Sequence, residues 1–242
     1  MKRRADELLV AQGLAASRAR AKAEIAAGHV RAGTTPVTKP AQLLDEGIRL
    51  TLHGANPYVS RGGLKLAHAL DTFAIAPAGA IALDIGASTG GFTDVLLRRG
   101  VARVYAVDVG QGQFAEALAC DRRVVLMERT DARTLTREHV PDAVDLVVAD
   151  VSFIALAKAL PQALALAVPG ATLVALVKPQ FEAGPEHVGK GGIVKDPAVH
   201  RAVCAAAGAW LDREGWHVNG IIESPITGGD GNTEFLLHAG KR

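Results

Sequence analysis

Two charged residues stand where apolar segments end, at positions from which they could remove a proton from a weak acid. Asp150 ends the segment Asp145-Leu-Val-Val-Ala-Asp150, and Lys178 ends the segment Thr172-Leu-Val-Ala-Leu-Val-Lys178. A charge at the end of an apolar strand is desolvated, so it needs a partner or a function. A salt bridge to a neighbouring carboxylate is one reading. In the other reading, both side chains face one cleft, and a lysine whose charged form is disfavoured by burial or by a second cation takes a proton from a sugar hydroxyl.

A glycine-rich turn indicates the second reactant. The segment Ile81-Ala-Leu-Asp84-Ile-Gly86-Ala-Ser88-Thr-Gly90-Gly91-Phe92 predicts a strand, a turn and the start of a helix over about 91–99. Glycines let the backbone approach a ligand, and free N–H groups at the helix start point toward it. The spacing differs from the G-x-G-x-x-G of dinucleotide-binding folds. Asp84 precedes the first glycine by two residues and suits a cation, such as the ammonium and sulfonium of S-adenosylmethionine. This pattern is typical of class I methyltransferases.

Acidic residues follow three further predicted strands. Asp108 ends the second strand, Asp131 follows the third and Asp150 ends the fourth. In open α/β sheets, ligands bind outside the carboxyl ends of the strands, where an acid accepts hydrogen bonds from ribose hydroxyls. Asp108 suits the ribose, and Asp131 suits the adenine amino group. A single acid could be an accident of the surface, but three at successive strand ends predict a nucleoside ligand. Methyl transfer from a sulfonium then requires mainly that the enzyme align the acceptor and remove its proton.

The segments that position these residues alternate between strands and helices. Continuous Val, Leu and Ala runs are typical of buried parallel strands, and they occur at 80–85, 103–108, 123–128, 145–150, 172–178, 216–223 and 233–239. Helices are predicted at about 113–120, 154–167 and 197–214. The last two strands are joined only by a Gly-rich loop, which predicts an antiparallel pair. The expected fold class is α/β, with the Rossmann-like, seven-stranded sheet of class I methyltransferases.

The first 60 residues differ from the rest in charge. They carry a net charge of +4, whereas the remaining residues carry −2. Two short helices at 5–12 and 18–27, followed by short strands at 29–31 and 48–52, resemble the RNA-binding module named after ribosomal small-subunit protein four. Clustered positive charge favours contact with RNA, although a solvated helix face with incidental arginines would give the same pattern. The RNA-binding candidates are Arg3, Arg4, Arg18, Arg20, Lys22 and Arg31.

Length and composition fit a globular chain of two domains. The 242 residues, 49% apolar and 21% charged, are enough for a full core. We expect a small α+β RNA-binding domain at 1–54, a linker at 55–60 and a methyltransferase domain at 61–242. Cys120 and Cys204 lie far apart and without a His cluster, so neither a disulfide nor a metal site is expected. No apolar run reaches the roughly 18–20 residues that span a bilayer, and no signal peptide is recognisable, which predicts a cytoplasmic protein with no membrane partner.

Four residues carry a family resemblance. Lys65, Asp150, Lys178 and Glu234 resemble the Lys-Asp-Lys-Glu tetrad of FtsJ-like ribose 2′-O-methyltransferases, in the same order and on the expected elements. The motifs around them and the small basic domain are similar to those of the TlyA family, often labelled hemolysin A. These motifs are Val59-Ser-Arg-Gly-Gly-Leu-Lys65-Leu, Asp84-Ile-Gly-Ala-Ser-Thr-Gly-Gly-Phe92-Thr-Asp, Asp150-Val-Ser-Phe-Ile, Val177-Lys-Pro-Gln-Phe-Glu182 and Gly228-Gly-Asp-Gly-Asn-Thr-Glu234-Phe. The resemblance covers nearly the whole chain and implies a cytidine 2′-O-methyltransferase that uses S-adenosylmethionine and acts on ribosomal RNA or ribosomal subunits.

The resemblance also implies roles for individual residues. Lys178 would activate the 2′-hydroxyl, and Asp150 would orient Lys178 near the methionine end of the cofactor. Lys65 would position the ribose and favour the neutral form of Lys178, while Glu234 would hold the lysines in place. The residues implied around the cofactor are Asp84, Gly86, Ala87, Ser88, Gly90, Gly91, Phe92, Asp108, Asp131 and Asp150.

Three features leave alternatives open. The Gly-rich loop at 182–195 either closes over the substrate or serves only as a long connection. The linker motif Arg-x-Trp-Val of well-known relatives reads Asn56-Pro-Tyr58-Val59 here, so coupling between the domains can differ. The chain is also short at both ends beside members that modify both ribosomal subunits, which favours large-subunit RNA as the substrate.

Other functions fit the sequence less well. Amino-group methyltransferases usually show Asn/Asp-Pro-Pro-aromatic after the fourth strand and carbon methyltransferases a catalytic cysteine, where this chain has Asp150-Val-Ser-Phe153. A membrane-active hemolysin would need a long apolar segment or a basic amphipathic helix with aromatic anchors, yet aromatic residues make up 4% of the chain and are scattered. A non-catalytic RNA-binding ribosome-assembly factor is a further alternative, against which the complete tetrad argues.

Overall fold

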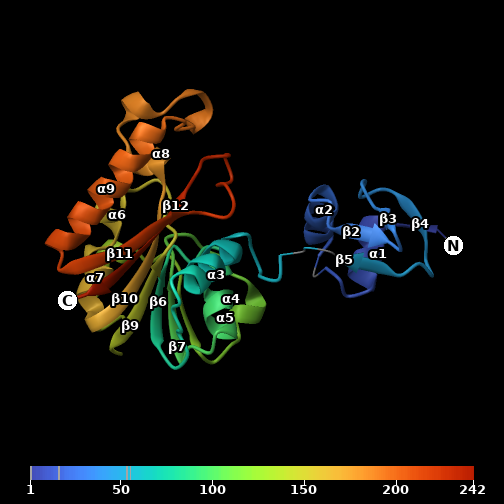
Figure 1. The fold of residues 1–242 in the computed structure, drawn as a ribbon. Helices are drawn as coiled ribbons and strands as arrows, with labels where there is room; N and C mark the ends of the chain where they lie inside the picture. The colour runs from blue at the N-terminus through green and yellow to red at the C-terminus, as the bar shows by residue number, and fades with distance from the viewer. Residues whose placement is uncertain (1, 16, 53, 55) are drawn as a thin grey trace. The chain divides into compact units, whose positions relative to one another are not determined.

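The computed structural model describes residues 2–15, 17–52, 54 and 56–242, and it divides between Pro57 and Tyr58 into two compact units (Figure 1). We call these the smaller unit and the larger unit. The division falls inside the segment 55–60 that the sequence predicts as a linker. Met1, Ala16, His53 and Ala55 lie outside the described residues, and the limits 1–54, 55–60 and 61–242 stay a prediction.

The smaller unit packs two helices against short antiparallel strands. Its elements are β1 (Lys2–Arg4), α1 (Ala5–Ala11), α2 (Arg18–Ala26), β2 (Val30–Ala32), β3 (Thr35–Pro36), β4 (Leu43–Asp45) and β5 (Leu50–Leu52). β2 pairs with both β3 and β5, and β1 pairs with β4. Ser17 caps α2 by accepting the Arg20 N–H, and Gly28 follows the end of α2 with a φ of 76°. The two predicted helices and the short strands after them are confirmed, and Leu9, Ile25 and Val30 fill their core.

The larger unit alternates strands and helices. Its strands are β6 (Ile81–Ile85), β7 (Arg103–Val107), β8 (Val124–Met127), β9 (Val144–Ala149), β10 (Ala167–Val177), β11 (Trp216–Glu223) and β12 (Phe235–Lys241). Its α-helices are α3 (Gly62–Thr72), α4 (Gly91–Arg98), α5 (Glu116–Ala119), α6 (Leu156–Ala159), α7 (Pro161–Leu166), α8 (Pro179–Glu182) and α9 (Pro197–Arg213). Short 3-10 turns follow Asp131, Gly184 and Gly189.

The strands form one seven-stranded sheet in the order β11-β12-β10-β9-β6-β7-β8. β12 runs antiparallel to both of its neighbours, and the other neighbouring strands are parallel. One hydrophobic core lies between the sheet and α6, α7 and α9, and a second lies between the sheet and α3, α4 and α5 (Figure 1). The chain reverses its direction across the sheet between β6 and β9, so the carboxyl ends of these strands are where a ligand site is expected. The predicted fold class is confirmed.

Three boundaries differ from the sequence-based expectation. Of the helix expected at 113–120, only the part that forms α5 is helical. The helix expected at 154–167 is divided into α6 and α7. Pro161 begins α7, and a proline has no N–H to continue the preceding helix. The strand expected at 172–178 begins at Ala167, with a register shift before Thr172. A bulge of this kind hides the start of a strand from an apolar pattern.

Within residues 2–15, 17–52, 54 and 56–242, no helix combines the length and the apolar character that a membrane span requires. The same residues contain no group of three or more His, Cys, Asp or Glu side chains that could hold a metal ion.

Candidate functional site

Two adjoining cavities lie at the carboxyl ends of β6, β7 and β9. The larger has a volume of about 430 Å³ and is lined by the chain segments that follow β6, β7, β8 and β9. The smaller has a volume of about 170 Å³ and lies between the start of α3, the glycine turn and the end of β10. Gly86, Ser88, Asp150 and Ser152 line both cavities. A molecule in the larger cavity would therefore meet a molecule in the smaller one beside Asp150.

The glycine turn is shaped by close approach of the backbone. Gly86 has a φ of 81°, and a Cβ atom there would stand 2.6 Å from the carbonyl oxygen of Asp150. Gly90, at φ 92°, is the N-cap of α4, and a Cβ atom on Gly91 would displace Oγ of Ser60. Glycine is therefore required at Gly86 and favoured at Gly90, because a side chain at Gly86 would collide with backbone and the positive φ of both residues disfavours other residue types. Ala87 and Phe92 are buried behind the turn, and both line the smaller cavity.

Asp84 lies beneath the turn instead of in a cavity wall. The side chain is fully buried, and the Thr93 hydroxyl donates a hydrogen bond to its Oδ2 at 2.6 Å. The second oxygen, Oδ1, is buried and has no hydrogen-bond partner in the described part of the chain. Burial raises the pKa of Asp84 to about 7, and the Asp150 carboxylate contributes in the same direction. The protonated form of Asp84 is therefore favoured over a wide pH range.

This burial predicts a stability effect that depends on pH. Because the Asp84 pKa is raised on folding to about 7, the native state holds a proton that the unfolded chain loses near pH 4, and the free energy of unfolding falls as pH rises from about 4 to about 7. Asp84→Asn cannot titrate. We expect its stability relative to wild type to rise by as much as about 4 kcal/mol over that interval. Denaturant unfolding at several pH values measures this, with the exposed Asp71→Asn as control, and a difference that stays constant with pH would contradict the burial argument.

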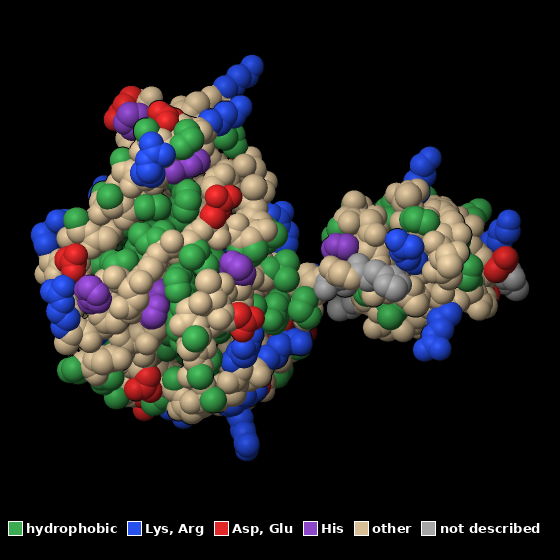
Figure 2. All heavy atoms as spheres, viewed as in Figure 1, with side chains coloured by type: hydrophobic (Ala, Val, Ile, Leu, Met, Phe, Trp, Pro, Cys, Tyr) green, Lys and Arg blue, Asp and Glu red, His purple; other side chains and the backbone are tan. Residues whose placement is uncertain are grey.

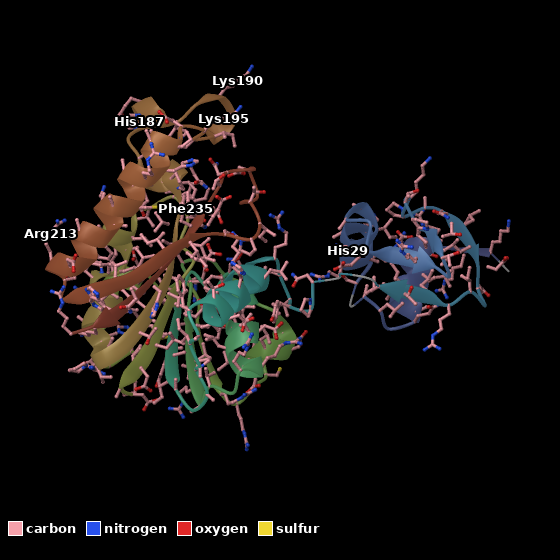
Figure 3. All side chains as sticks on the ribbon, in the orientation of Figure 1. His29, His187, Lys190, Lys195, Arg213 and Phe235 are labelled. Atoms are coloured by element: carbon pink, nitrogen blue, oxygen red, sulfur yellow. The ribbon has the colours of Figure 1, made fainter. Side chains whose placement is uncertain are left out.

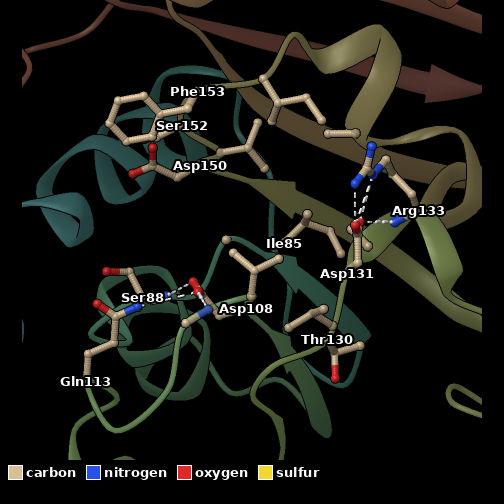
Figure 4. A pocket seen from close by; sticks show the side chains of 18 residues that line it. Ile85, Ser88, Asp108, Gln113, Thr130, Asp131, Arg133, Asp150, Ser152 and Phe153 are labelled. Carbon is tan, nitrogen blue, oxygen red and sulfur yellow. Dashed lines mark hydrogen bonds and ion pairs between the residues drawn. The ribbon is translucent and has the colours of Figure 1, made fainter.

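Asp108 and Asp131 both line the larger cavity, but their carboxylates have different hydrogen-bond donors (Figure 4). Asp108 accepts the backbone N–H of Ser88 at 2.7 Å and that of Gly110 at 2.6 Å, which fixes its carboxylate at the end of β7. Both oxygens of Asp131 accept hydrogen bonds from the Arg133 guanidinium, at 2.6 to 3.0 Å. The hydrogen bonds from Arg133 lower the pKa of Asp131. Among the described residues, Asp108 thus has only neutral partners, whereas both oxygens of Asp131 are paired with a cation.

The four tetrad residues form two ion pairs at the smaller cavity, whose wall includes Lys65, Asp150 and Lys178. Lys178 Nζ lies 2.6 Å from Oδ1 of Asp150, and Lys65 Nζ donates to Oε2 of Glu234. Lys65 and Lys178 are each 7% exposed and Glu234 is 3% exposed. α3 supplies Lys65, the ends of β9 and β10 supply Asp150 and Lys178, and the loop before β12 supplies Glu234. Asp150 and Lys178 therefore form a salt bridge and also line one cavity, while the removal of a proton by Lys178 stays a prediction.

The Lys178 amine contacts both Asp150 and Ser152. Lys178 Nζ and Asp150 Oδ1 are close but not aligned as a hydrogen bond, so Asp150 Oδ1 is buried without a hydrogen bond in the described residues. Lys178 instead donates a hydrogen bond to Oγ of Ser152 at 2.9 Å. Ser152 and the neighbouring Phe153, which is 90% exposed at φ 64°, were not among the predicted site residues. The only signal for them was their position within Asp150-Val-Ser-Phe153, because a serine and an exposed phenylalanine carry no charge pattern.

The loop after α8 is held by a buried amide. Asn232 accepts the Val194 N–H at 2.9 Å and donates to the carbonyl of Gly192 at 3.0 Å, which ties this loop to the one that carries Glu234. His187, Lys190 and Lys195 project outward from the loop (Figure 3). Its base is therefore fixed close to the tetrad, which fits either a substrate-covering loop or a connection.

The predicted RNA-binding residues lie on the smaller unit, where most of them form ion pairs. Arg4 and Arg18 both bind the buried Asp6, at 2.9 and 3.1 Å, and Arg20 binds Glu24 at 2.7 Å. Arg3 lies 3.8 Å from Glu7. Arg3, Arg4, Arg18 and Arg20 thus lie beside acids, which the spacing of these residues in the sequence does not show. Their contact with RNA stays a prediction. Lys22 and Arg31 are exposed and have no ion pair within the described residues. Figure 2 shows several Lys and Arg side chains on the visible face of this unit.

Comparisons with known proteins agree with this arrangement. The family model described as FtsJ-like methyltransferase matches residues 58–241, and that of the S4 domain matches residues 3–49. The chain is 50% identical over 240 residues to YqxC of Bacillus subtilis (strain 168), described as a presumed rRNA methyltransferase, with 98% of this chain and 85% of that protein covered. It is 49% identical over 236 residues to the 16S/23S rRNA (cytidine-2′-O)-methyltransferase TlyA of Mycobacterium tuberculosis (strain ATCC 25618 / H37Rv), with 97% and 88% covered.

A solved structure is also similar over nearly the whole chain. It is that of a presumed hemolysin from Streptococcus thermophilus, which is 43% identical, with a TM-score of 0.78 and with 99% of this chain and 88% of that chain covered. The chain therefore belongs to the family of FtsJ-like methyltransferases.

Proposed function

We propose that this FtsJ-like methyltransferase transfers a methyl group from S-adenosylmethionine to the 2′-hydroxyl of a cytidine in ribosomal RNA. The observation that carries the proposal is the meeting of two cavities beside Asp150. The larger is lined by the strand-end acids Asp108 and Asp131, and the smaller by the glycine turn, Lys65 and Lys178. A donor and an acceptor held in these cavities would have their reacting atoms next to Lys178. Alignment of this kind supplies much of the rate enhancement of a displacement reaction.

The larger cavity fits the nucleoside part of the cofactor. Its volume of about 430 Å³ lies within the range of small-molecule sites. Asp108 would accept hydrogen bonds from the ribose hydroxyls, and Asp131 would lie at the adenine. Gly86, Ser88 and Gly90 would let the backbone approach the methionine end, and the Asp150 carboxylate, which lines both cavities, would lie near its ammonium group. S-adenosylmethionine, when bound, supplies the electrophilic methyl group and its sulfide leaving group.

The chain's own residues would do the acid–base work on the acceptor. Lys178 would take the proton of the 2′-hydroxyl as the new bond forms, because a ribose hydroxyl is too weak an acid to react unaided. Asp150 and Ser152 would hold the Lys178 amine, which contacts both. Lys65, tied to Glu234, would bind the ribose from the opposite side of the cavity.

We further propose that the smaller unit binds ribosomal RNA. Lys22 and Arg31 are exposed without an ion pair among the described residues, so they can contact phosphate groups directly. The partly exposed pair of Arg3 and Glu7 is weak enough for a phosphate group to compete for Arg3. The match to the S4 domain supports this assignment. The enzyme would then act on ribosomal subunits in the cytoplasm, the smaller unit supplying affinity and the larger unit the chemistry.

Charge reversal tests the RNA-binding surface. Lys22→Glu is expected to lower the affinity for ribosomal RNA by roughly tenfold and to flatten its salt dependence, since each lost phosphate contact removes about 0.7–0.9 from the slope of log K against log salt. Arg18→Glu should act in the same direction, although it also breaks the ion pair with Asp6. Titrations at several salt concentrations measure both quantities, with Lys158→Glu on α6 as control. If neither variant differs from that control in affinity or salt dependence, the smaller unit does not bind RNA through α2.

Transfer of a labelled methyl group tests the proposed function itself. The purified chain, labelled S-adenosylmethionine and ribosomal RNA or subunits from cells that lack this protein should yield labelled RNA. Mass mapping of the product identifies the nucleotide and shows which subunit is the substrate. An absence of label in every RNA and subunit tested would count against the proposal.

A further inference from the structure

Arg61 is an exposed cation that lies beside the tetrad without belonging to it. Its guanidinium donates a hydrogen bond to the backbone carbonyl of Thr227 at 2.5 Å. Among the described residues it has no carboxylate within 4.0 Å, a property that it shares with Arg213 but not with Arg98 of the same unit. Because its one recorded partner is a neutral carbonyl, the positive charge of Arg61 is not compensated.

The position of Arg61 places this charge at the rim of the smaller cavity. Its sequence neighbours Ser60 and Gly62 both line that cavity. Lys65 follows one helical turn later, about 6 Å along the axis of α3. The start of α3 and the residue before it are thus joined twice to the loop between β11 and β12, by Arg61 to Thr227 and by Lys65 to Glu234. The guanidinium therefore stands beside the place where a target ribose would enter.

We propose that Arg61 binds a backbone phosphate of the substrate RNA next to the target ribose. This inference rests on the proposed function, because it assumes that an RNA ribose occupies the smaller cavity. Each ribose in an RNA strand is flanked by phosphates, so a ribose in that cavity brings one of them close to the cavity rim. A guanidinium offers five N–H donors in a planar fork that matches two phosphate oxygens. Thr227 uses one of these donors and holds the fork in place, while the others stay available.

The tests are binding measurements on Arg61→Gln and Arg61→Lys with a ribosomal RNA transcript that carries no methylation. Arg61→Gln is expected to bind the transcript about tenfold more weakly and to lose about 0.7–0.9 from the salt-dependence slope. Arg61→Lys should keep the slope but not the full affinity, because lysine retains the charge and loses the fork. The affinity for S-adenosylmethionine should not change in either variant. Arg213→Gln, at the far end of α9 (Figure 3), removes the same charge and serves as control.

Two results would overturn this inference. Arg61→Gln could bind the transcript with the affinity and slope of Arg213→Gln, which would exclude a phosphate contact. Arg61→Gln could also bind the transcript normally and methylate it slowly. That result would show that the hydrogen bond from Arg61 to Thr227 only maintains the conformation of the loop between β11 and β12. If Arg61→Gln fails to fold, the unchanged slope expected for Arg61→Lys still tests the phosphate contact. RNA binding by wild type without methyl transfer would count against the proposed function alone, since these measurements do not require turnover.

Discussion

Replacing Lys178 by alanine is expected to lower the rate of methyl transfer by about 10²- to 10⁴-fold, the usual contribution of a positioned general base. The amine lies between Asp150 and Ser152 at the junction of the two cavities, and alanine leaves no group there to receive the proton. The larger cavity does not include Lys178 among its lining residues. Binding of S-adenosylmethionine should therefore persist. Single-turnover methylation of ribosomal RNA and calorimetric titration of the cofactor measure the two effects separately.

Two companion variants show whether this loss is specific. Lys158→Ala removes an exposed lysine from α6 and should methylate at the wild-type rate. Asp108→Ala should give the opposite result to Lys178→Ala, with weaker cofactor binding, because Asp108 lines only the larger cavity. Wild-type activity of Lys178→Ala on ribosomal subunits would exclude Lys178 as the base.

Breaking the ion pair between Lys65 and Glu234 is expected to have the largest effect on stability. Both side chains are almost completely buried, so Lys65→Met leaves the Glu234 carboxylate in the interior without its cation. Removing one partner of such a pair typically lowers the free energy of unfolding by about 3–5 kcal/mol. The double variant Lys65→Met/Glu234→Leu should recover most of that loss, because it leaves no buried charge behind.

The unfolding of the larger unit can be followed by itself. Trp210 and Trp216 are the two tryptophans of the chain, and both are buried in that unit. Their fluorescence during denaturant unfolding therefore reports the larger unit independently of the smaller one. A loss below about 1 kcal/mol for Lys65→Met, the range of exposed pairs, would show that this pair is open to water in solution.

The sequence predicts the sheet and the tetrad better than it predicts the surroundings of the individual acids. The apolar runs that end in Asp150 and Lys178 place both residues at neighbouring strand ends, because the carboxyl ends of parallel strands meet at one edge. Asp84 ends no strand, and its spacing before Gly86 does not show that Thr93 and the turn bury it. The ion pair between Arg133 and Asp131 cannot be predicted from the sequence either, because both residues lie in a turn and turns have no periodic pattern of apolar residues.

Contacts between distant segments are the part that sequence patterns cannot supply. Arg4 and Arg18 converge on Asp6 because α1 and α2 pack together, and nothing in their spacing indicates that pairing. Asn232 reaches Val194 across 38 positions of the chain. The sequence similarly gives no reason to expect Arg61 beside Thr227. Such contacts depend on how the loops at the end of the sheet fold over one another, which is decided by packing and not by local propensity.

The position of the transferred methyl group tests the central claim most directly. After incubation with labelled S-adenosylmethionine, the ribosomal RNA is hydrolysed completely with alkali and the products are separated. Alkaline cleavage requires a free 2′-hydroxyl, so a ribose methylated there leaves an uncleaved dinucleotide. Transfer beside Lys178 predicts that the label appears in a dinucleotide whose first nucleoside is cytidine. Label found only in mononucleotides would place the methyl group on a base and would contradict the claim.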